Sequence, residues 1–139
     1  MKISEGNKKI IVQEFRYIAK KIKQTENNEE KLYYFSGSQG MVSRILNIEF
    51  DLSLIFIHHI LQTAHGTLSN TLKSIISGQE RVIKLPENLF ERLAKELQQL
   101  SNEIEKDKDF YSTLANISVL AYVGTGNGYY LYQKGLLKI

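Results

Sequence analysis

Three histidines, His58, His59 and His65, are the residues whose type first suggests chemistry, because imidazole is a common metal ligand and proton carrier. His58 and His65 are seven residues apart, which on a helix separates them by about 10.5 Å along the axis at ~1.5 Å per residue. Bonds of about 2.1 Å to one ion cannot span that separation, and His59 points to another face. The pattern favours polar positions on a partly buried helix, where His58, Gln62, His65 and Ser69 could line a hydrogen-bonded groove.

Other catalytic patterns are missing from the sequence. The chain has no cysteine, so it has neither a thiol nucleophile nor a zinc–cysteine site. A Gly-x-Ser-x-Gly motif around a serine is absent. None of Arg44, Arg81 and Arg92 is followed four to six residues later by a histidine, as in helical ribonucleases of the HEPN class. We therefore expect a protein that is not an enzyme and that carries no metal or cofactor.

The stretch Gly124-Thr125-Gly126-Asn127-Gly128 could expose backbone amides to a phosphate group. The Gly-Lys-Ser/Thr end of a P-loop and the Gly-x-Gly-x-x-Gly spacing after a strand are both absent. The stretch is more typical of a helix C-terminus followed by a turn.

Contact with nucleic acid is suggested by a polar stripe on the first expected helix, which we call the basic stripe: Lys9, Gln13, Arg16, Lys20 and Lys23. These residues follow one another at steps of four, three, four and three, so they share one helical face, and no acid interrupts them. Near the C-terminus, an aromatic ring and an ammonium group could stack on an unpaired base and meet a phosphate. We predict that the RNA or DNA backbone is bound by Lys9, Arg16, Lys20, Lys23, Tyr130 and Lys134. The alternative is that the stripe is a solvated helix face.

The C-terminal tyrosines have three interpretations. Tyr129, Tyr130 and Tyr132 could form the rim of the core, could stack on bases, or could lie in a contact with another protein, since tyrosine is enriched at interfaces. We predict an oligomer or a larger complex with these three residues near the contact.

Length and composition are those of one domain, residues 1–139, with a formal net charge of +3 that permits nucleic-acid binding without requiring it. The absence of cysteine fits a reducing compartment, and the polar stretch Met1–Asn7 lacks the apolar region of a signal peptide. No apolar run is long enough to cross a membrane. We therefore expect a cytoplasmic protein with no membrane contact.

The run Met41–Ile76 is the most apolar stretch and predicts the central helix. One apolar series comprises Met41, Ile45, Ile48, Leu52 and Ile55, and a second comprises Phe50, Leu54, Ile57, Leu61, Ala64 and Leu68, continued by Leu72 and Ile75. The two series lie on nearly opposite faces, so we expect a helix that is covered on two sides. The alternation over residues 48–56 also fits a half-buried strand, but the second series continues for three further turns. The segment is one helix or two with a break near 47–51, where Asp51 could serve as an N-cap.

Further helices are expected on either side of this segment. The first covers about Lys8–Lys23, and its apolar positions are Ile11, Phe15, Ile18 and Ile22. A polar loop follows at Thr25–Glu30. The Ser36–Gln39 capping-box pattern then predicts the start of the central segment, which ends near Gly78. After an extended connector at Arg81–Leu85, a helix is expected with Pro86 as its first residue. The apolar series of this helix is Leu89, Leu93, Leu97, Leu100 and Ile104. Another helix is expected after residue 109, with the apolar series Phe110, Leu114, Ile117 and Ala121. A short helix interrupted by Gly135 would complete the chain.

Together these patterns predict an all-α fold: a single antiparallel bundle of four or five helices around a two-faced central helix. In size, charge and helical content the chain is similar to the small helical subunits of RNA-guided effector complexes, including those of CRISPR systems. The function hypothesis is accordingly a non-catalytic subunit that contacts the nucleic-acid backbone within a larger assembly. The alternative is a protein-interaction or homo-oligomerisation module without nucleic acid.

Overall fold

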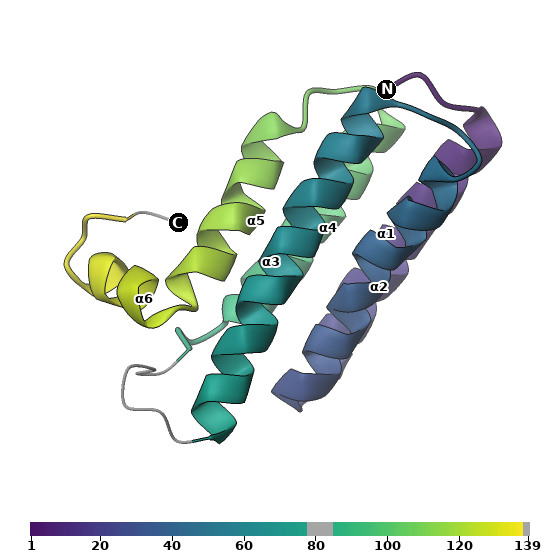
Figure 1. Cartoon of the computed structure of the whole chain (residues 1–139). Helices are drawn as coiled ribbons and strands as arrows, with labels where there is room; N and C mark the ends of the chain where they lie inside the picture. The colour runs from purple at the N-terminus through teal and green to yellow at the C-terminus, as the bar shows by residue number, and fades with distance from the viewer. Residues whose placement is uncertain (78–84, 138–139) are drawn as a thin grey trace.

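The computed structural model describes residues 1–77 and 85–137, which form six α-helices and no strand (Figure 1). In chain order the helices are α1 (Glu5–Gln24), α2 (Asn28–Leu46), α3 (Leu52–Ile76), α4 (Leu89–Glu105), α5 (Tyr111–Val123) and α6 (Gly126–Gln133). The predicted all-α class is confirmed. Six helices are found where four or five were expected, because a turn divides the long apolar segment and the C-terminal residues form a helix of their own.

Five of the helices share one hydrophobic core. Helix α1 packs against α2 and α4, α3 packs against α2 and α5, and α4 packs against α5. These contacts make a ring of neighbours, so α3 is one wall of the core. The prediction that this helix lies at the centre of the bundle is therefore wrong. Helix α6 packs on α5 at the edge of the molecule (Figure 1). No helix among the described residues is long and apolar enough to span a bilayer.

The helical periodicity of the sequence identified most of the core correctly. Every member of the predicted series on α1, α4 and α5 is buried, as is the series on α3 from Leu54 to Leu72. These positions recur every three or four residues, which places them on the side of each helix that faces its neighbours. Among the described residues, no buried side-chain nitrogen or oxygen lacks a hydrogen-bond partner.

The prediction that α3 is covered on two faces is wrong. The other apolar series is divided between α2, where Ile45 is buried, and the turn and first residues of α3, where Ile48, Leu52 and Ile55 are exposed. Phe50, which was expected on the buried series, is exposed as well. The cause is the break between Leu46 and Leu52, since a turn does not preserve the angular relation that aligns residues along one helix.

The start of α2 was also predicted wrongly. The helix begins at Asn28 and not at Ser36, and the Asn27 side chain accepts hydrogen bonds from the amides of Glu29 and Glu30 at 2.7 and 3.1 Å. The expected loop at 25–30 is therefore only three residues long. Ser36 lies inside the helix, where its hydroxyl donates to the Tyr33 carbonyl oxygen at 2.5 Å.

The start of α4 lies later than expected. Pro86 precedes the helix, which begins at Leu89 after Asn88 in the left-handed conformation with φ of 61°. Asparagine tolerates this conformation better than most residues do. Most of the expected connector Arg81–Leu85, and the expected helix stop at Gly78, lie outside the described residues.

The glycine-rich stretch joins α5 to α6, and it acts as the helix terminus and turn that the sequence favoured. Gly124 is the C-cap of α5, and the Thr125 side chain caps α6 by accepting from the Gly128 amide at 3.0 Å. Gly128 approaches α5 so closely that a Cβ atom there would overlap the carbonyl group of Tyr122. Glycine at this position therefore permits α6 to fold back onto α5.

Candidate interaction surface

The turn between α2 and α3 has a defined geometry at both ends. The α2 helix ends with the amides of Ile48 and Glu49 donating to the Ile45 carbonyl oxygen at 2.9 and 2.8 Å. At the start of α3, Asp51 is the N-cap, as the sequence suggested, and its Oδ1 accepts from the Leu54 amide at 3.1 Å. The turn is thus held by hydrogen bonds on both sides.

Residues of the N-terminal segment hold the two acids of this turn by hydrogen bonds. Glu49 accepts from the Ser4 amide at 2.7 Å and from the Asn7 side-chain amide at 2.6 Å. The second oxygen of Asp51 accepts from the Lys2 amide at 3.0 Å. The hydrogen bond from Asn7 is the main cause of a lowered pKa for Glu49. Burial acts to raise the pKa of Asp51, but the amides of Lys2 and Leu54 outweigh it and leave that pKa lowered.

The apolar residues that alternate with these two acids are exposed to solvent. Ile48, Phe50 and Leu52 are 75%, 73% and 73% exposed. On the first turns of α3, Ile55 and Phe56 are also exposed, and the Phe56 ring lies 5.7 Å from the ring of Tyr111 at the start of α5. We call this surface the turn patch: Ile48, Phe50, Leu52, Ile55, Phe56 and Tyr111.

Sequence reasoning placed most of these residues in the core and so missed the patch. One local signal could have found it. If Asp51 caps a new helix, then Leu52 is the first residue of that helix, and Ile48 and Phe50 belong to a turn outside its buried face.

One of the four positive charges of the basic stripe, that of Arg16, is paired with an acid of a neighbouring helix. The Arg16 guanidinium donates to both carboxylate oxygens of Glu105 on α4 at 3.0 Å each, and to Asn102 at 2.9 Å. This pairing is the main cause of the raised pKa of Arg16 and the lowered pKa of Glu105. Lys9, Lys20 and Lys23 are exposed, and none of them has an ion pair within the described part of the chain.

The C-terminal residues predicted to bind nucleic acid lie on α6 and just after it. The ammonium of Lys134 is 5.6 Å from the centre of the exposed Tyr130 ring. Tyr129 and Tyr132 are half-buried, with ring centres 6.4 Å apart. Helices α6 and α1 lie on opposite sides of the molecule (Figure 1), so the structure does not bring Tyr130 and Lys134 together with the basic stripe.

The histidines form no metal site. Across residues 1–77 and 85–137, no group of three or more histidine, aspartate or glutamate side chains is placed to hold an ion. His65 is partly buried on α3, its ring centre lies 6.4 Å from that of Phe35, and burial is the main cause of its lowered pKa. No side-chain hydrogen bond joins His58, Gln62, His65 and Ser69, the four residues considered as a polar groove on this helix.

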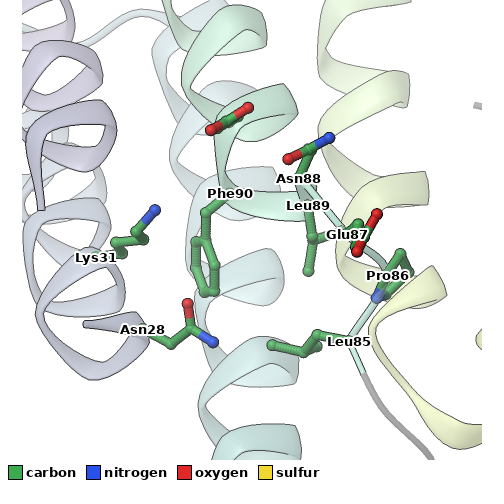
Figure 2. A pocket seen from close by; sticks show the side chains of 9 residues that line it. Asn28, Lys31, Leu85, Pro86, Glu87, Asn88, Leu89 and Phe90 are labelled. Carbon is green, nitrogen blue, oxygen red and sulfur yellow. The ribbon is translucent and has the colours of Figure 1, made fainter. Parts of the chain in front are cut away.

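A shallow pocket of about 240 Å³ lies between the start of α2 and the segment before α4 (Figure 2). Asn28 and Lys31 form one wall, and the residues from Leu85 onward form the other. The lining contains one lysine and the two glutamates Glu87 and Glu91, so it presents no concentrated charge of one sign to a ligand.

The chain matches no protein-family model, no curated protein sequence and no solved structure. The assignment of function therefore depends on the surface of the molecule itself.

Proposed function

We propose that this protein is a protein-interaction module that binds its partner through the turn patch. The observation that carries the proposal is the exposure of six neighbouring apolar and aromatic side chains at one end of the molecule. Applying the exposed fractions to residue areas of ~150–250 Å² gives an exposed area of roughly 540–900 Å², most of it apolar. The largest apolar patch on a typical monomer is about 300–600 Å² and is itself often functional.

The proposal is supported by the hydrogen bonds that hold the turn. A turn exposing two large aliphatic residues and a phenylalanine gains nothing from their contact with water, yet its conformation is fixed by Asp51, Glu49 and the N-terminal residues. A surface that is ordered before binding loses less conformational entropy on association.

Site-specific photo-crosslinking in living cells tests the proposal. A benzophenone amino acid in place of Phe50 should form covalent adducts with the partner. The matched control carries the same group in place of Tyr33, which is 74% exposed on α2 and, at 1.5 Å per residue, about 20 Å from the end of that helix. Adducts from position 50 and none from position 33 support the proposal. Equal yields from both positions, or none from either, would contradict it.

A second candidate is contact with the backbone of RNA or DNA, as in a small subunit of an RNA-guided assembly. The observation that favours it is the exposure of Lys9, Lys20 and Lys23, which lie on one face of α1 over about 21 Å at 1.5 Å per residue. Arg16 is occupied by Glu105, so three charges remain for phosphates in place of the four that the sequence suggested.

Filter binding over a range of salt concentrations tests this candidate. Three neutralised phosphates give a slope of log affinity against log salt of about −2.7 on duplex DNA or about −2.1 on single strands. Lys20→Ala should reduce the magnitude of the slope by about one unit, whereas Lys73→Ala, in the last turn of α3, should not change it. The candidate is rejected if neither nucleic acid binds below ~100 μM.

A further inference from the structure

We infer that the partner of the turn patch is a second copy of this chain, and that two copies associate about a two-fold axis near Phe50. The inference rests on the proposed function, and it adds the identity of the partner and the symmetry of the complex. Two features of the patch favour a second copy: its area and the placement of charge around it.

The area of the patch matches what a stable dimer needs. A standard protein–protein interface buries about 800 Å² on each partner, and the exposed surface of the patch alone is roughly 540–900 Å². In a two-fold interface the same surface is used on both copies, so one patch supplies both halves. Polar atoms at its border would add the remaining area.

The charges of the turn are arranged so that the patch can face itself. Near a two-fold axis each residue meets its own copy, so a free carboxylate there would meet a second carboxylate. Glu49 and Asp51 alternate with the exposed apolar residues Ile48, Phe50 and Leu52, but both are hydrogen-bonded to residues 2–7 of their own chain. The two acids among residues 48–52 therefore keep their charge but direct it toward the N-terminal residues of their own chain.

Phe50 is the natural centre of the contact. It lies between Ile48 and Leu52, and all three are about three-quarters exposed. Ile55, Phe56 and Tyr111 extend the surface to one side along α3 and α5. A ring in the middle of a desolvated interface is the kind of residue that dominates binding energy.

Sedimentation velocity of the purified chain from ~1 μM to ~1 mM, a range that covers weak and moderate affinities, tests the inference. We expect a concentration-dependent dimer that raising the salt from ~0.1 to ~1 M does not weaken, because no exposed charges are paired across its centre. Phe50→Lys should weaken dimerisation by about 30-fold or more, as removal of a central anchor does. Tyr33→Lys, an equally exposed aromatic on α2, should leave it unchanged. Both side chains are largely in solvent, so both variants should keep the helical circular dichroism of the parent.

The absence of cysteine from the chain provides a second readout. Phe50→Cys should form a disulfide-linked dimer under mild oxidation, because residues near a two-fold axis approach their own copies. Tyr33→Cys should remain free of this crosslink under the same conditions and at the same protein concentration.

A chain that stays monomeric throughout this concentration range overturns the inference. The crosslinking from position 50 then decides whether the proposed function fails as well. Adducts with a different protein would leave the patch as a binding surface, whereas the absence of adducts would remove the proposed function as well. Binding of the monomer to lipid vesicles in place of dimerisation also overturns the inference. So does a dimer that Tyr130→Lys weakens and Phe50→Lys does not, because its contact would lie at α6.

Discussion

Replacing Asp51 by alanine removes two hydrogen bonds that fix the turn patch. One is the N-cap bond from the Leu54 amide at 3.1 Å, and the other is the bond from the Lys2 amide at 3.0 Å. Loss of an N-cap costs about 0.5–2 kcal/mol of protein stability. The bond to Lys2 lies at an exposed site where water replaces it, so we assign it little of the total.

The expected result for Asp51→Ala is a loss of about 1–2 kcal/mol in the free energy of unfolding. For a chain of this length, about 3–5 °C of melting temperature corresponds to each kcal/mol, so the midpoint should fall by roughly 3–10 °C. Asp51→Asn is the matched control, because asparagine caps a helix about as well as aspartate. Its side-chain oxygen can keep the bond to Leu54 but carries no charge, so its midpoint should lie below that of the parent and nearer to it than to that of Asp51→Ala.

The dependence of stability on pH provides a second check on the same site. Because the folded-state pKa of Asp51 is lowered, its carboxylate stabilises the fold above the pKa of the unfolded chain, and this contribution is lost as the pH falls through the folded-state value. The stability difference between the parent and Asp51→Asn should therefore shrink as the pH falls from about 5 to about 3.

Urea denaturation followed by circular dichroism at several pH values measures both effects. An Asp51→Ala stability within about 0.5 kcal/mol of the parent at neutral pH would refute the role of Asp51 as the cap of α3. A destabilisation by Asp51→Asn as large as that by Asp51→Ala would show that the charge, and not the cap, is the stabilising element.

Two further substitutions test the packing of the helices. Leu61→Ala, at a fully buried position of α3, should lower the free energy of unfolding by about 2–5 kcal/mol in urea denaturation. Leu136→Ala, at a position 74% exposed, should stay within about 0.5 kcal/mol of the parent. Equal effects of the two substitutions would contradict the buried face of α3. Gly128→Ala should destabilise the protein by about 1–3 kcal/mol because α6 must move away from α5. Gly66→Ala, with open space around it on α3, should stabilise by about 0.5–1 kcal/mol, and a stabilising Gly128→Ala would disprove the close approach.

Periodicity in the sequence was enough to predict the buried faces of α1, α4 and α5, and that of α3 from Leu54 to Leu72. The series on α4 from Leu89 to Ile104 and the series on α1 from Ile11 to Ile22 were correct because an uninterrupted helix keeps its side chains in a fixed angular order. Periodicity failed at the turn patch, where no helix connects Ile48 to Leu52. Two capping patterns compete for the start of α2. Asn27 with Glu30 resembles a capping box, and so does Ser36 with Gln39. The helix begins at the earlier of the two, with Asn27 as its N-cap.

The functional surface could not be derived from local patterns, because contacts between distant residues decide it. The acids of the turn are held by residues 42–49 positions earlier in the chain, and Phe50 between them is exposed. In the same way, the charge of Arg16 is taken up by Glu105, which lies 89 positions away. A sequence shows the spacing of Arg16 and Lys20 on one helix, but not which carboxylates a neighbouring helix brings to them.

Accessibility of the turn patch inside the cell is the measurement that tests the central claim most directly. The chain has no cysteine, so Leu52→Cys and Leu136→Cys each provide one thiol, at positions 73% and 74% exposed in the isolated chain. Both variants are labelled with a membrane-permeant maleimide in living cells and, for comparison, as dilute purified protein. A partner bound at the turn patch predicts that the thiol at position 52 is labelled rapidly in the dilute protein but slowly in cells, while the thiol at position 136 is labelled rapidly in both. Equal and rapid labelling of the two thiols in cells would contradict the assignment of the turn patch as a binding surface.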